Sequence, residues 1–151
     1  MGSGPFPTEL QDENGELLRK IGNEFGATTG RPRRCGWIDL VALRYACMIN
    51  GVTKVVMTKS DVLDSFTDLQ ACTAYEINGK QTDEVPFQMM QEQITPLYRH
   101  FKGWNTDITK MKDAAALPEN MSTYIAFINQ YIGAPVKFVS NGPEREQIIT
   151  L

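Results

Sequence analysis

Three arginines and two threonines gather in a glycine-rich stretch, residues 26–36, of this 151-residue chain. Glycines let the backbone approach a ligand closely, and the guanidinium groups of Arg31, Arg33 and Arg34 suit carboxylates or phosphates. A helical pattern that starts at Trp37 would put the stretch beside a helix N-terminus, where anions are favoured. These residues predict an anion-recognition loop. A solvated basic turn is the alternative.

Two short polar turns follow apolar segments that are typical of buried strands. The turn 59–61 contains Asp61, and a carboxylate at the end of a strand can accept hydrogen bonds from N1–H and the 2-amino group of guanine. Adenine lacks that pair of donors. The stem of Lys59 can pack along the base plane. The turn 140–142 follows another strand, so both turns can converge on one base, although a solvated turn also explains each one alone.

Periodicity and turn residues predict the elements that must position these segments. Helices are expected over 16–25, 37–50 and 118–132, and strands over 52–58, 136–139 and 148–151. A hairpin is expected with strands 70–77 and 80–85, because Asn78-Gly79 is a strong turn signal. A helical turn is expected over 87–93, and the pattern of 97–104 is ambiguous. The order indicates an α/β architecture with a mainly parallel sheet, flanking helices and an appended β-hairpin.

Composition excludes several classes of protein. Fifteen Lys and Arg against eighteen Asp and Glu, with no basic block, argue against nucleic acid and membrane surfaces as partners. No apolar run reaches the roughly 18 residues of a membrane span. Cys35, Cys47 and Cys72 lie far apart, which argues against a zinc site or a disulfide scaffold and favours the cytoplasm. His100 is expected to be partly buried or interfacial. The chain has no Walker phosphate-binding pattern.

Several motifs are specific when taken together. They are Gly4-Pro5-Phe6-Pro7-Thr8-Glu9, Gly22-Asn23-Glu24-Phe25-Gly26-Ala27-Thr28-Thr29-Gly30-Arg31, Arg33-Arg34-Cys35-Gly36-Trp37, Thr58-Lys59-Ser60-Asp61-Val62-Leu63-Asp64 and Ser140-Asn141-Gly142-Pro143. With them, nearly the whole chain resembles the C-terminal part of adenylosuccinate synthetases. Two positions depart from the family pattern, since Ser60 stands where Leu is common and Asn141 where many members have Thr.

The resemblance implies a P-loop-NTPase-like synthetase of purine biosynthesis. Members of the family join IMP and L-aspartate, using GTP and Mg²⁺, to form adenylosuccinate, GDP and phosphate. They phosphorylate the 6-oxygen of IMP, and the aspartate amine then displaces phosphate. The resemblance also implies a cytoplasmic homodimer.

The resemblance further implies roles for individual residues. The loop that binds aspartate would comprise Ala27, Thr28, Thr29, Gly30, Arg31, Pro32 and Arg33, with Arg31 also reaching IMP. The GTP site would comprise Arg33, Lys59, Ser60, Asp61, Ser140, Asn141 and Gly142.

Residues 1–151 resemble roughly the last third of the enzyme. The family's phosphate-binding loop, catalytic aspartate and histidine, and most IMP contacts belong to an N-terminal region that this chain lacks. We therefore expect no catalytic residue, no metal ligand and no synthetase activity in the chain alone, and we expect exposed apolar surface that favours self-association. Two alternatives are a non-catalytic guanine-nucleotide binding module and a small interaction domain whose arginine loop grips an acidic partner.

Overall fold

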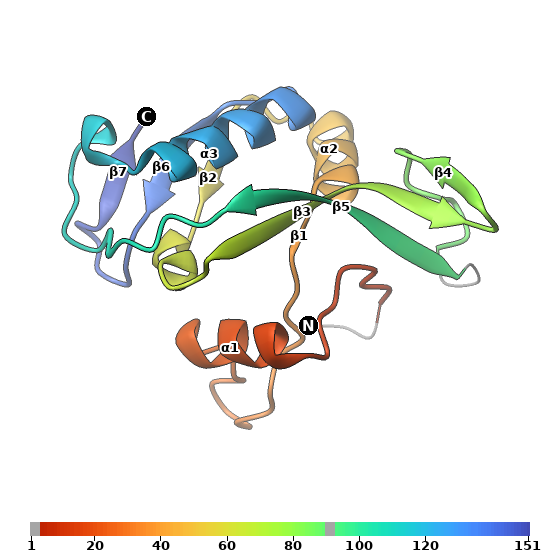
Figure 1. The fold of residues 1–151 in the computed structure, drawn as a ribbon, viewed down its shortest axis with the longest axis horizontal. Helices are drawn as coiled ribbons and strands as arrows, with labels where there is room; N and C mark the ends of the chain where they lie inside the picture. The colour runs from red at the N-terminus through yellow and green to blue at the C-terminus, as the bar shows by residue number, and fades with distance from the viewer. Residues whose placement is uncertain (1–3, 90–92) are drawn as a thin grey trace. The chain divides into compact units, whose positions relative to one another are not determined.

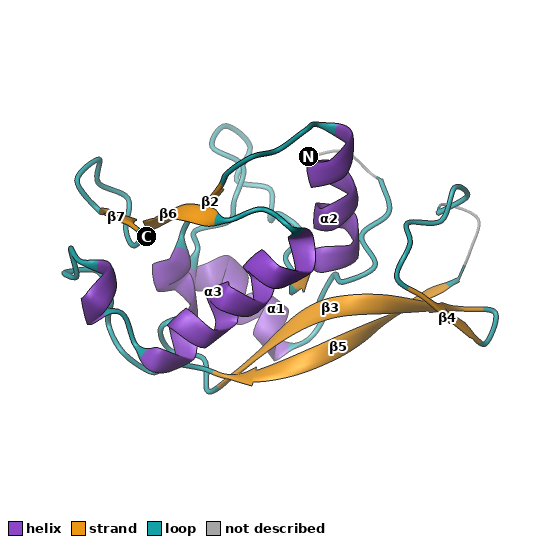
Figure 2. Cartoon of the chain, turned by 90° about the horizontal axis from the view of Figure 1, so that it is seen from above, coloured by secondary structure: helices purple, strands orange, loops and turns teal. Residues whose placement is uncertain are grey.

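The structure is a computed structural model that describes residues 4–89 and 93–151. These ranges contain both helices and strands (Figure 1, Figure 2), which confirms the expected α/β class. The chain divides into two compact units, and each is described by itself. The first contains the described residues up to 42 and between 70 and 99, and the second contains residues 43–69 and 100–151. Neither unit is continuous in sequence, so no linker marks the division.

A sheet around β3 (Asp68–Ile77) organises the first unit. β1 (Ile38–Asp39) pairs with β3 in parallel, and β4 (Lys80–Thr82) pairs with it antiparallel. β5 (Ile94–Lys102), which takes up most of the ambiguous stretch, also pairs with β3. Asn78 and Gly79 both have positive φ, 52° and 74°, the backbone that a two-residue hairpin turn requires. The predicted hairpin is therefore confirmed, with a shorter return strand.

The core of the first unit lies against β3. Its fully buried centre consists of Val41, Cys72 and Tyr75, and partly buried apolar side chains pack around it: Ile77, Val85, Met89, Ile94 and Tyr98. Because β3 is covered on both faces over most of its length, its sequence is nearly continuous in apolar and small residues. Of the helical turn predicted over 87–93, the structure has a turn at 87–89. Residues 90–92 lie outside the described residues.

Aspartate side chains fix where the first two helices begin. Asp12 accepts a hydrogen bond from the Gly15 N–H at 3.1 Å, so α1 (Glu13–Ile21) begins before the predicted start at residue 16. Asp39 accepts from the Ala42 N–H at 3.0 Å in the same way, so α2 (Leu40–Ile49) begins after it. The prediction that Trp37 starts the helix is wrong, because residues 38–39 pair with β3 and separate the glycine-rich stretch from α2.

A second sheet organises the second unit. Its central strand is β6 (Val136–Ser140), with β2 (Val55–Met57) parallel on one side and β7 (Ile148–Thr150) antiparallel on the other. Within the described ranges the strands therefore form two mixed sheets rather than one mainly parallel sheet. The physical reason is that β4 and β7 each return directly along the strand before them, and such short connections give antiparallel pairs.

Helix α3 (Glu119–Ile132) supplies five buried side chains to the core of the second unit, and its prediction is confirmed. Phe101 stacks edge-on against Tyr124, with ring centroids 5.1 Å apart, and Phe127 lies at the same distance from Phe101. The helix ends at Gly133, which has φ 71°. One side of the helix is buried along its length, at Met121, Tyr124, Ile125, Ile128 and Ile132. This stripe recurs every three or four residues, which is why the helix was predictable.

Apolar side chains also remain exposed. In the second unit they are Tyr45, Met48, Ile49, Val56, Phe138 and Ile148.

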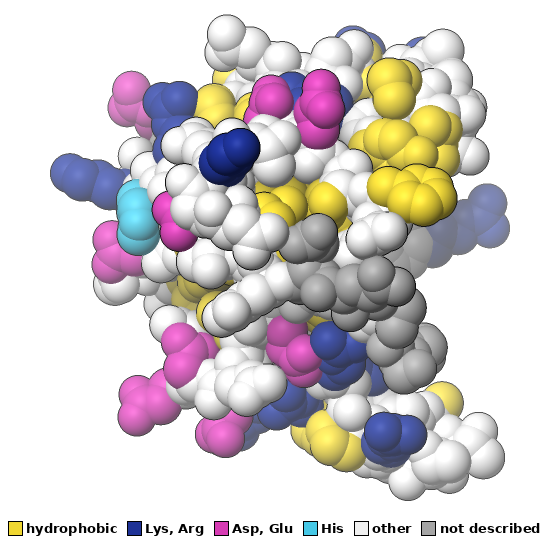
Figure 3. Space-filling view, turned by 90° about the vertical axis from the view of Figure 1, so that its right-hand side faces the viewer, with side chains coloured by type: hydrophobic (Ala, Val, Ile, Leu, Met, Phe, Trp, Pro, Cys, Tyr) yellow, Lys and Arg dark blue, Asp and Glu magenta, His cyan; other side chains and the backbone are white. Residues whose placement is uncertain are grey.

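His100 is exposed on β5 rather than partly buried. On the face seen in Figure 3, acidic and basic side chains are interspersed. Among the helices of the described ranges, none has the length and apolarity that crossing a bilayer would need.

Candidate functional site

The glycine-rich stretch forms a loop whose ends are held together by backbone hydrogen bonds. The Arg33 N–H donates to the Glu24 carbonyl at 2.9 Å, and the Gly26 N–H donates to the Arg31 carbonyl at 2.8 Å. Gly30, which has φ 64°, donates to the Gly26 carbonyl at 2.8 Å. The tip between these glycines is exposed, so its hydroxyl groups and backbone face solvent. This geometry leaves the tip accessible to a ligand.

The three arginines of the loop differ in what they contact. Arg33 donates to Glu24 at 2.8 Å, and Arg34 donates to Glu9 at 2.7 Å. The bond to Glu9 also raises the pKa of Arg34. Arg31 is exposed, and its guanidinium has no partner among the described residues. Of the three predicted anion-binding arginines, Arg31 is thus the one whose guanidinium forms no ion pair with the described residues.

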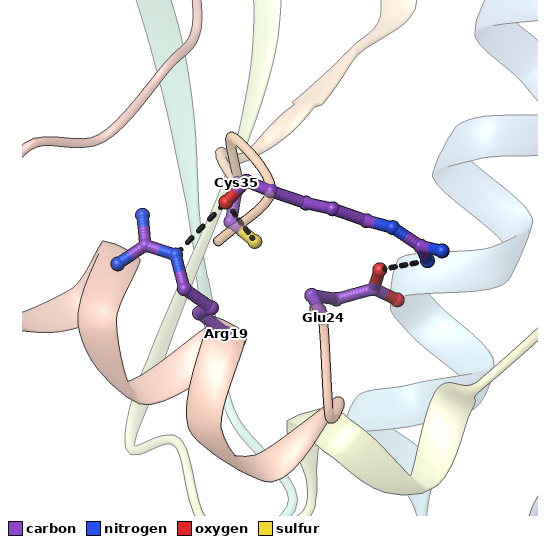
Figure 4. Close-up of polar contacts among 4 residues, drawn as sticks. Arg19, Glu24 and Cys35 are labelled. Carbon is purple, nitrogen blue, oxygen red and sulfur yellow. Dashed lines mark hydrogen bonds and ion pairs between the residues drawn. The ribbon is translucent and has the colours of Figure 1, made fainter. Parts of the chain in front are cut away.

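Helix α1 supports the base of this loop (Figure 4). The Arg33 carbonyl accepts hydrogen bonds from Arg19 Nε at 2.8 Å and from Cys35 Sγ at 3.7 Å. With the ion pair to Glu24 on its side chain, Arg33 is therefore held at both its backbone and its guanidinium. The base of the loop is fixed while its tip is open.

The first of the two polar turns has an unusual backbone. Lys59 lies in the left-handed region, with φ 56° and ψ 38°, and leads into the 3-10 helix η1 (Ser60–Leu63). A side chain in this region is uncommon and costs about 1–3 kcal/mol, so such residues gather at functional positions. The strained turn directs Ser60 and Asp61 inward, and Ser60 is 1% exposed. These residues are the ones that the sequence predicted.

The second turn is fixed through Asn141, which is fully buried. Its Nδ2 donates to the carbonyls of Ile108 at 2.5 Å and Met111 at 3.0 Å. Ser140 Oγ donates to the Gly142 carbonyl at 3.1 Å. Because β2 and β6 are parallel neighbours, this turn and the turn 59–61 leave the same edge of the sheet. The structure thus brings the two predicted base-binding turns together in the second unit.

Buried polar atoms without a partner mark these two turns. Four buried side-chain oxygens of the described residues have no hydrogen bond, and three of them belong here: Ser60 Oγ, Asp61 Oδ1 and Asn141 Oδ1. Burying a polar atom without a partner costs free energy, so a buried water or a bound ligand is expected to complete each of these atoms. The carboxylate and amide oxygens are acceptors and fit N–H donors of a ligand.

Sequence reasoning missed one residue of this region. Asp64 accepts hydrogen bonds from Trp104 Nε1 at 2.7 Å and from the Ile108 N–H at 3.0 Å. Burial raises the pKa of Asp64, and the two hydrogen bonds oppose that shift in part. The sequence does show a second aspartate three positions after Asp61. Its role could not be inferred because Trp104 and Ile108, which it contacts, lie far along the chain.

The predicted aspartate-loop residues, from Ala27 to Arg33, all lie in the first unit, and the residues of the two turns lie in the second. Among the described residues, no group of three His, Cys, Asp or Glu side chains is arranged to hold a metal ion.

Comparison with known proteins gives a consistent picture. Residues 1–149 match the family model described as adenylosuccinate synthetase. The adenylosuccinate synthetase of Parabacteroides distasonis is 55% identical over 149 residues, covering 99% of this chain and 35% of that protein. That of Christiangramia forsetii is 53% identical over 150 residues, covering 99% of this chain and 36% of the protein. The chain thus spans about a third of the length of the curated relatives it matches.

A solved structure is also similar. The fully ligated adenylosuccinate synthetase of Plasmodium falciparum superimposes with a TM-score of 0.92 at 36% identity, covering 99% of this chain and 37% of that one.

Proposed function

Because this chain belongs to the adenylosuccinate synthetase family, we propose that it is the C-terminal third of a ligase acting on IMP, L-aspartate and GTP. The whole enzyme phosphorylates the 6-oxygen of IMP, and the amine of aspartate then displaces phosphate to leave adenylosuccinate. The chain supplies binding groups for aspartate and GTP, and one arginine that also reaches IMP. Phosphoryl transfer needs a phosphate cradle that we assign to the rest of the enzyme, so the chain alone has no turnover.

The observation that carries this proposal is the set of buried acceptors in the two turns. Asp61 Oδ1 and Asn141 Oδ1 have no partner among the described residues, and they follow neighbouring parallel strands. In our proposal the Asp61 carboxylate accepts from N1–H and the 2-amino group of guanine. Lys59 lies along the base, and residues 140–142 close over it. A nucleotide without these donors leaves a buried carboxylate unpaired, which disfavours its binding strongly.

The loop 27–33 binds the aspartate substrate in this proposal. The uncommitted guanidinium of Arg31 suits a carboxylate, which it can bind through two parallel hydrogen bonds. Hydroxyl and backbone N–H groups of the exposed tip supply further donors. Arg31 also contacts IMP, and Arg33 serves the GTP side while Glu24 holds its guanidinium.

Two further properties belong to the whole enzyme. We assign the Mg²⁺ that accompanies GTP to residues of the enzyme outside this chain, as the family implies. Mg²⁺ supplies charge neutralisation at the phosphates when bound. We also propose that the enzyme is a cytoplasmic homodimer, as the family implies.

The alternatives make different demands on the same residues. A non-catalytic guanine-nucleotide module would use the two turns without any product forming. An interaction domain with an acidic partner would use the arginines of the loop and leave the buried acceptors of the turns without a role. The orphaned oxygens at Ser60, Asp61 and Asn141 therefore favour nucleotide binding over a purely acidic partner.

The decisive experiment exchanges the acceptor for a donor in the full-length enzyme that contains this chain. Asp61→Asn presents an amide N–H that matches the 2-carbonyl of xanthine and clashes with the 2-amino group of guanine. We expect kcat/KM for GTP to fall about 100-fold, the cost of two hydrogen bonds, and kcat/KM for XTP to rise.

Asp113→Asn is the matched control, because Asp113 is exposed and makes no side-chain cap contact; this variant should retain the preference for GTP. Unchanged GTP use by Asp61→Asn would show that the base is read elsewhere. A full-length protein that binds GTP and forms no adenylosuccinate from IMP and aspartate would favour the non-catalytic module.

A further inference from the structure

Asp64 connects the turn 59–61 to a second segment, residues 104–111, which we call the bridging loop. The Asp64 backbone N–H donates to the Asp61 carbonyl at 3.1 Å, so the two aspartates are fixed to each other through η1. The Asp64 side chain accepts from Trp104 Nε1 at 2.7 Å through Oδ1 and from the Ile108 N–H at 3.0 Å through Oδ2. Both carboxylate oxygens therefore hold the bridging loop.

The other side of the bridging loop holds the turn 140–142. Ile108, which is fully buried, donates its N–H to Asp64 and offers its carbonyl to Asn141 at 2.5 Å. Farther along the bridging loop, the Met111 carbonyl accepts from Asn141, and Gln147 Nε2 donates to the Thr109 carbonyl at 3.1 Å. One residue, Ile108, thus joins Asp64 directly to Asn141.

From this chain of contacts we infer that Asp64 is a positioning residue for guanine specificity: it is tied to Asp61 through η1, and through Ile108 it holds Asn141 at the distance from Asp61 that a guanine base requires. The inference rests on the proposed nucleotide site and assigns Asp64 no contact with the nucleotide. Asp64 acts on the base by way of two other residues. Loss of the Asp64 carboxylate should therefore weaken the affinity and selectivity for guanine and leave the rate of the chemical step unchanged.

The carboxylate is needed because both partners are donors. An asparagine at this position has one acceptor oxygen, and its amide N–H would oppose either the Trp104 or the Ile108 N–H. A buried donor left without an acceptor moves away toward water or another group. Movement of Ile108 would displace Asn141, because the same residue carries the carbonyl that Asn141 contacts.

The test is steady-state kinetics of Asp64→Asn in the full-length enzyme, with GTP and ITP as nucleotides. ITP has N1–H but lacks the 2-amino group. The ratio of kcat/KM for GTP to kcat/KM for ITP therefore measures how strongly the site recognises the 2-amino group. We expect KM for GTP to rise about tenfold, the cost of one displaced hydrogen bond, with kcat within about twofold. The preference for GTP over ITP should fall, and KM for aspartate should not change.

Trp104→Phe is a second variant that disrupts the hydrogen bonding of Asp64. It removes the indole N–H that Asp64 accepts and keeps an aromatic ring near Tyr124, whose centroid lies 6.4 Å from that of Trp104. A smaller change in the same direction is expected, and this variant decides the question if Asp64→Asn fails to fold. Asp113→Asn is again the control and should match the wild type.

The inference is overturned if both variants are less stable yet keep the wild-type KM for GTP and the wild-type preference over ITP, since a purely structural role predicts that result. The outcome is distinguishable from failure of the proposed function. If Asp61→Asn alters nucleotide preference and the Asp64 and Trp104 variants do not, only this inference fails. If none of them alters it, the nucleotide site itself is wrong.

Discussion

The carboxylate of Glu24 and the guanidinium of Arg33 form an ion pair of 2.8 Å at the base of the arginine loop. The pair joins the two ends of the loop, and the backbone N–H of Arg33 donates to the Glu24 carbonyl as well. Charge at the base of the loop is thus already balanced. Two positions earlier in the chain, the guanidinium of Arg31 has no such partner among the described residues, and the arginines are therefore expected to respond differently to substitution.

Replacing Arg31 with leucine should remove ligand binding without loss of stability. The exposed guanidinium makes no contact that the fold needs, whereas a bidentate bond to a carboxylate is worth about 3 kcal/mol. We expect KM for aspartate to rise about 100-fold in the full-length enzyme, with an unchanged unfolding midpoint. Kinetics and thermal unfolding measure both. A lower midpoint with an unchanged KM would mean that Arg31 is a structural residue.

Arg34→Leu should give the opposite result. Arg34 contacts Glu9, donates to the Gly4 carbonyl at 2.8 Å and lies over the ring of Phe6 at 5.3 Å. Its loss should lower the unfolding midpoint of the 151-residue chain and leave KM for aspartate in the full-length enzyme unchanged. Differential scanning fluorimetry beside kinetics checks this. A large increase in KM would place Arg34 in the binding site instead.

Gly103→Ala should destabilise the second unit. The backbone there approaches the segment 66–67 so closely that a Cβ atom would collide with the Phe66 carbonyl, and the Gly103 N–H donates to the Thr67 carbonyl at 2.7 Å. We expect a loss of about 2–3 kcal/mol in the free energy of unfolding, because two backbone segments must separate. Urea denaturation measures it.

Gly4→Ala is the control for this prediction, since an added Cβ at Gly4 meets nothing within 4 Å; a change within about 0.5 kcal/mol is expected. Equal stability of the Gly103 and Gly4 variants would contradict the close approach.

The three cysteines should differ in reactivity. Cys72 is fully buried, and burial raises its pKa to about 12, so the thiol stays protonated and unreactive at about pH 8. Because the folded protein holds this proton more tightly than the unfolded chain, the stabilisation is present below pH 9.0 and is lost as the pH rises toward 12.

Cys35 is partly exposed and should be the first to react with iodoacetamide. Mass spectrometry of the native and the urea-unfolded chain measures the order. Early labelling of Cys72 in the native chain would be inconsistent with its burial.

Local signals accounted for the elements that sequence alone predicted well. α3 carries its own apolar stripe and ends at a glycine, and the turn Asn78-Gly79 needs no distant partner. The start of α2 was misjudged because residues 38–39 have helical periodicity but pair with β3, a contact that is remote in sequence. The boundaries of β5 were missed for a similar reason, since its residues alternate poorly and its pairing with β3 defines it.

In the candidate site too, the residues marked by local sequence were predictable, and the contacts that depend on tertiary structure were not. Lys59, Asp61 and Asn141 could be singled out because polar residues directly after apolar strands are informative. The pairing of each arginine with its own glutamate could not be predicted, because Glu9 and Glu24 are two of many acidic residues in the chain. Asp64 also escaped notice, because its role depends on Trp104 and Ile108, which only tertiary structure brings near.

The parallel pairing of β2 with β6 has a consequence for how the second unit folds. Val55 meets Val136 although β3, β5 and α3 all lie between them in the chain. Parallel pairs so distant in sequence close slowly, because the loop entropy is lost before the contact is made. The edge of the sheet where the two polar turns meet therefore cannot exist in a partly folded or incompletely synthesised chain. A nucleotide that bound there would report that folding of this unit is complete.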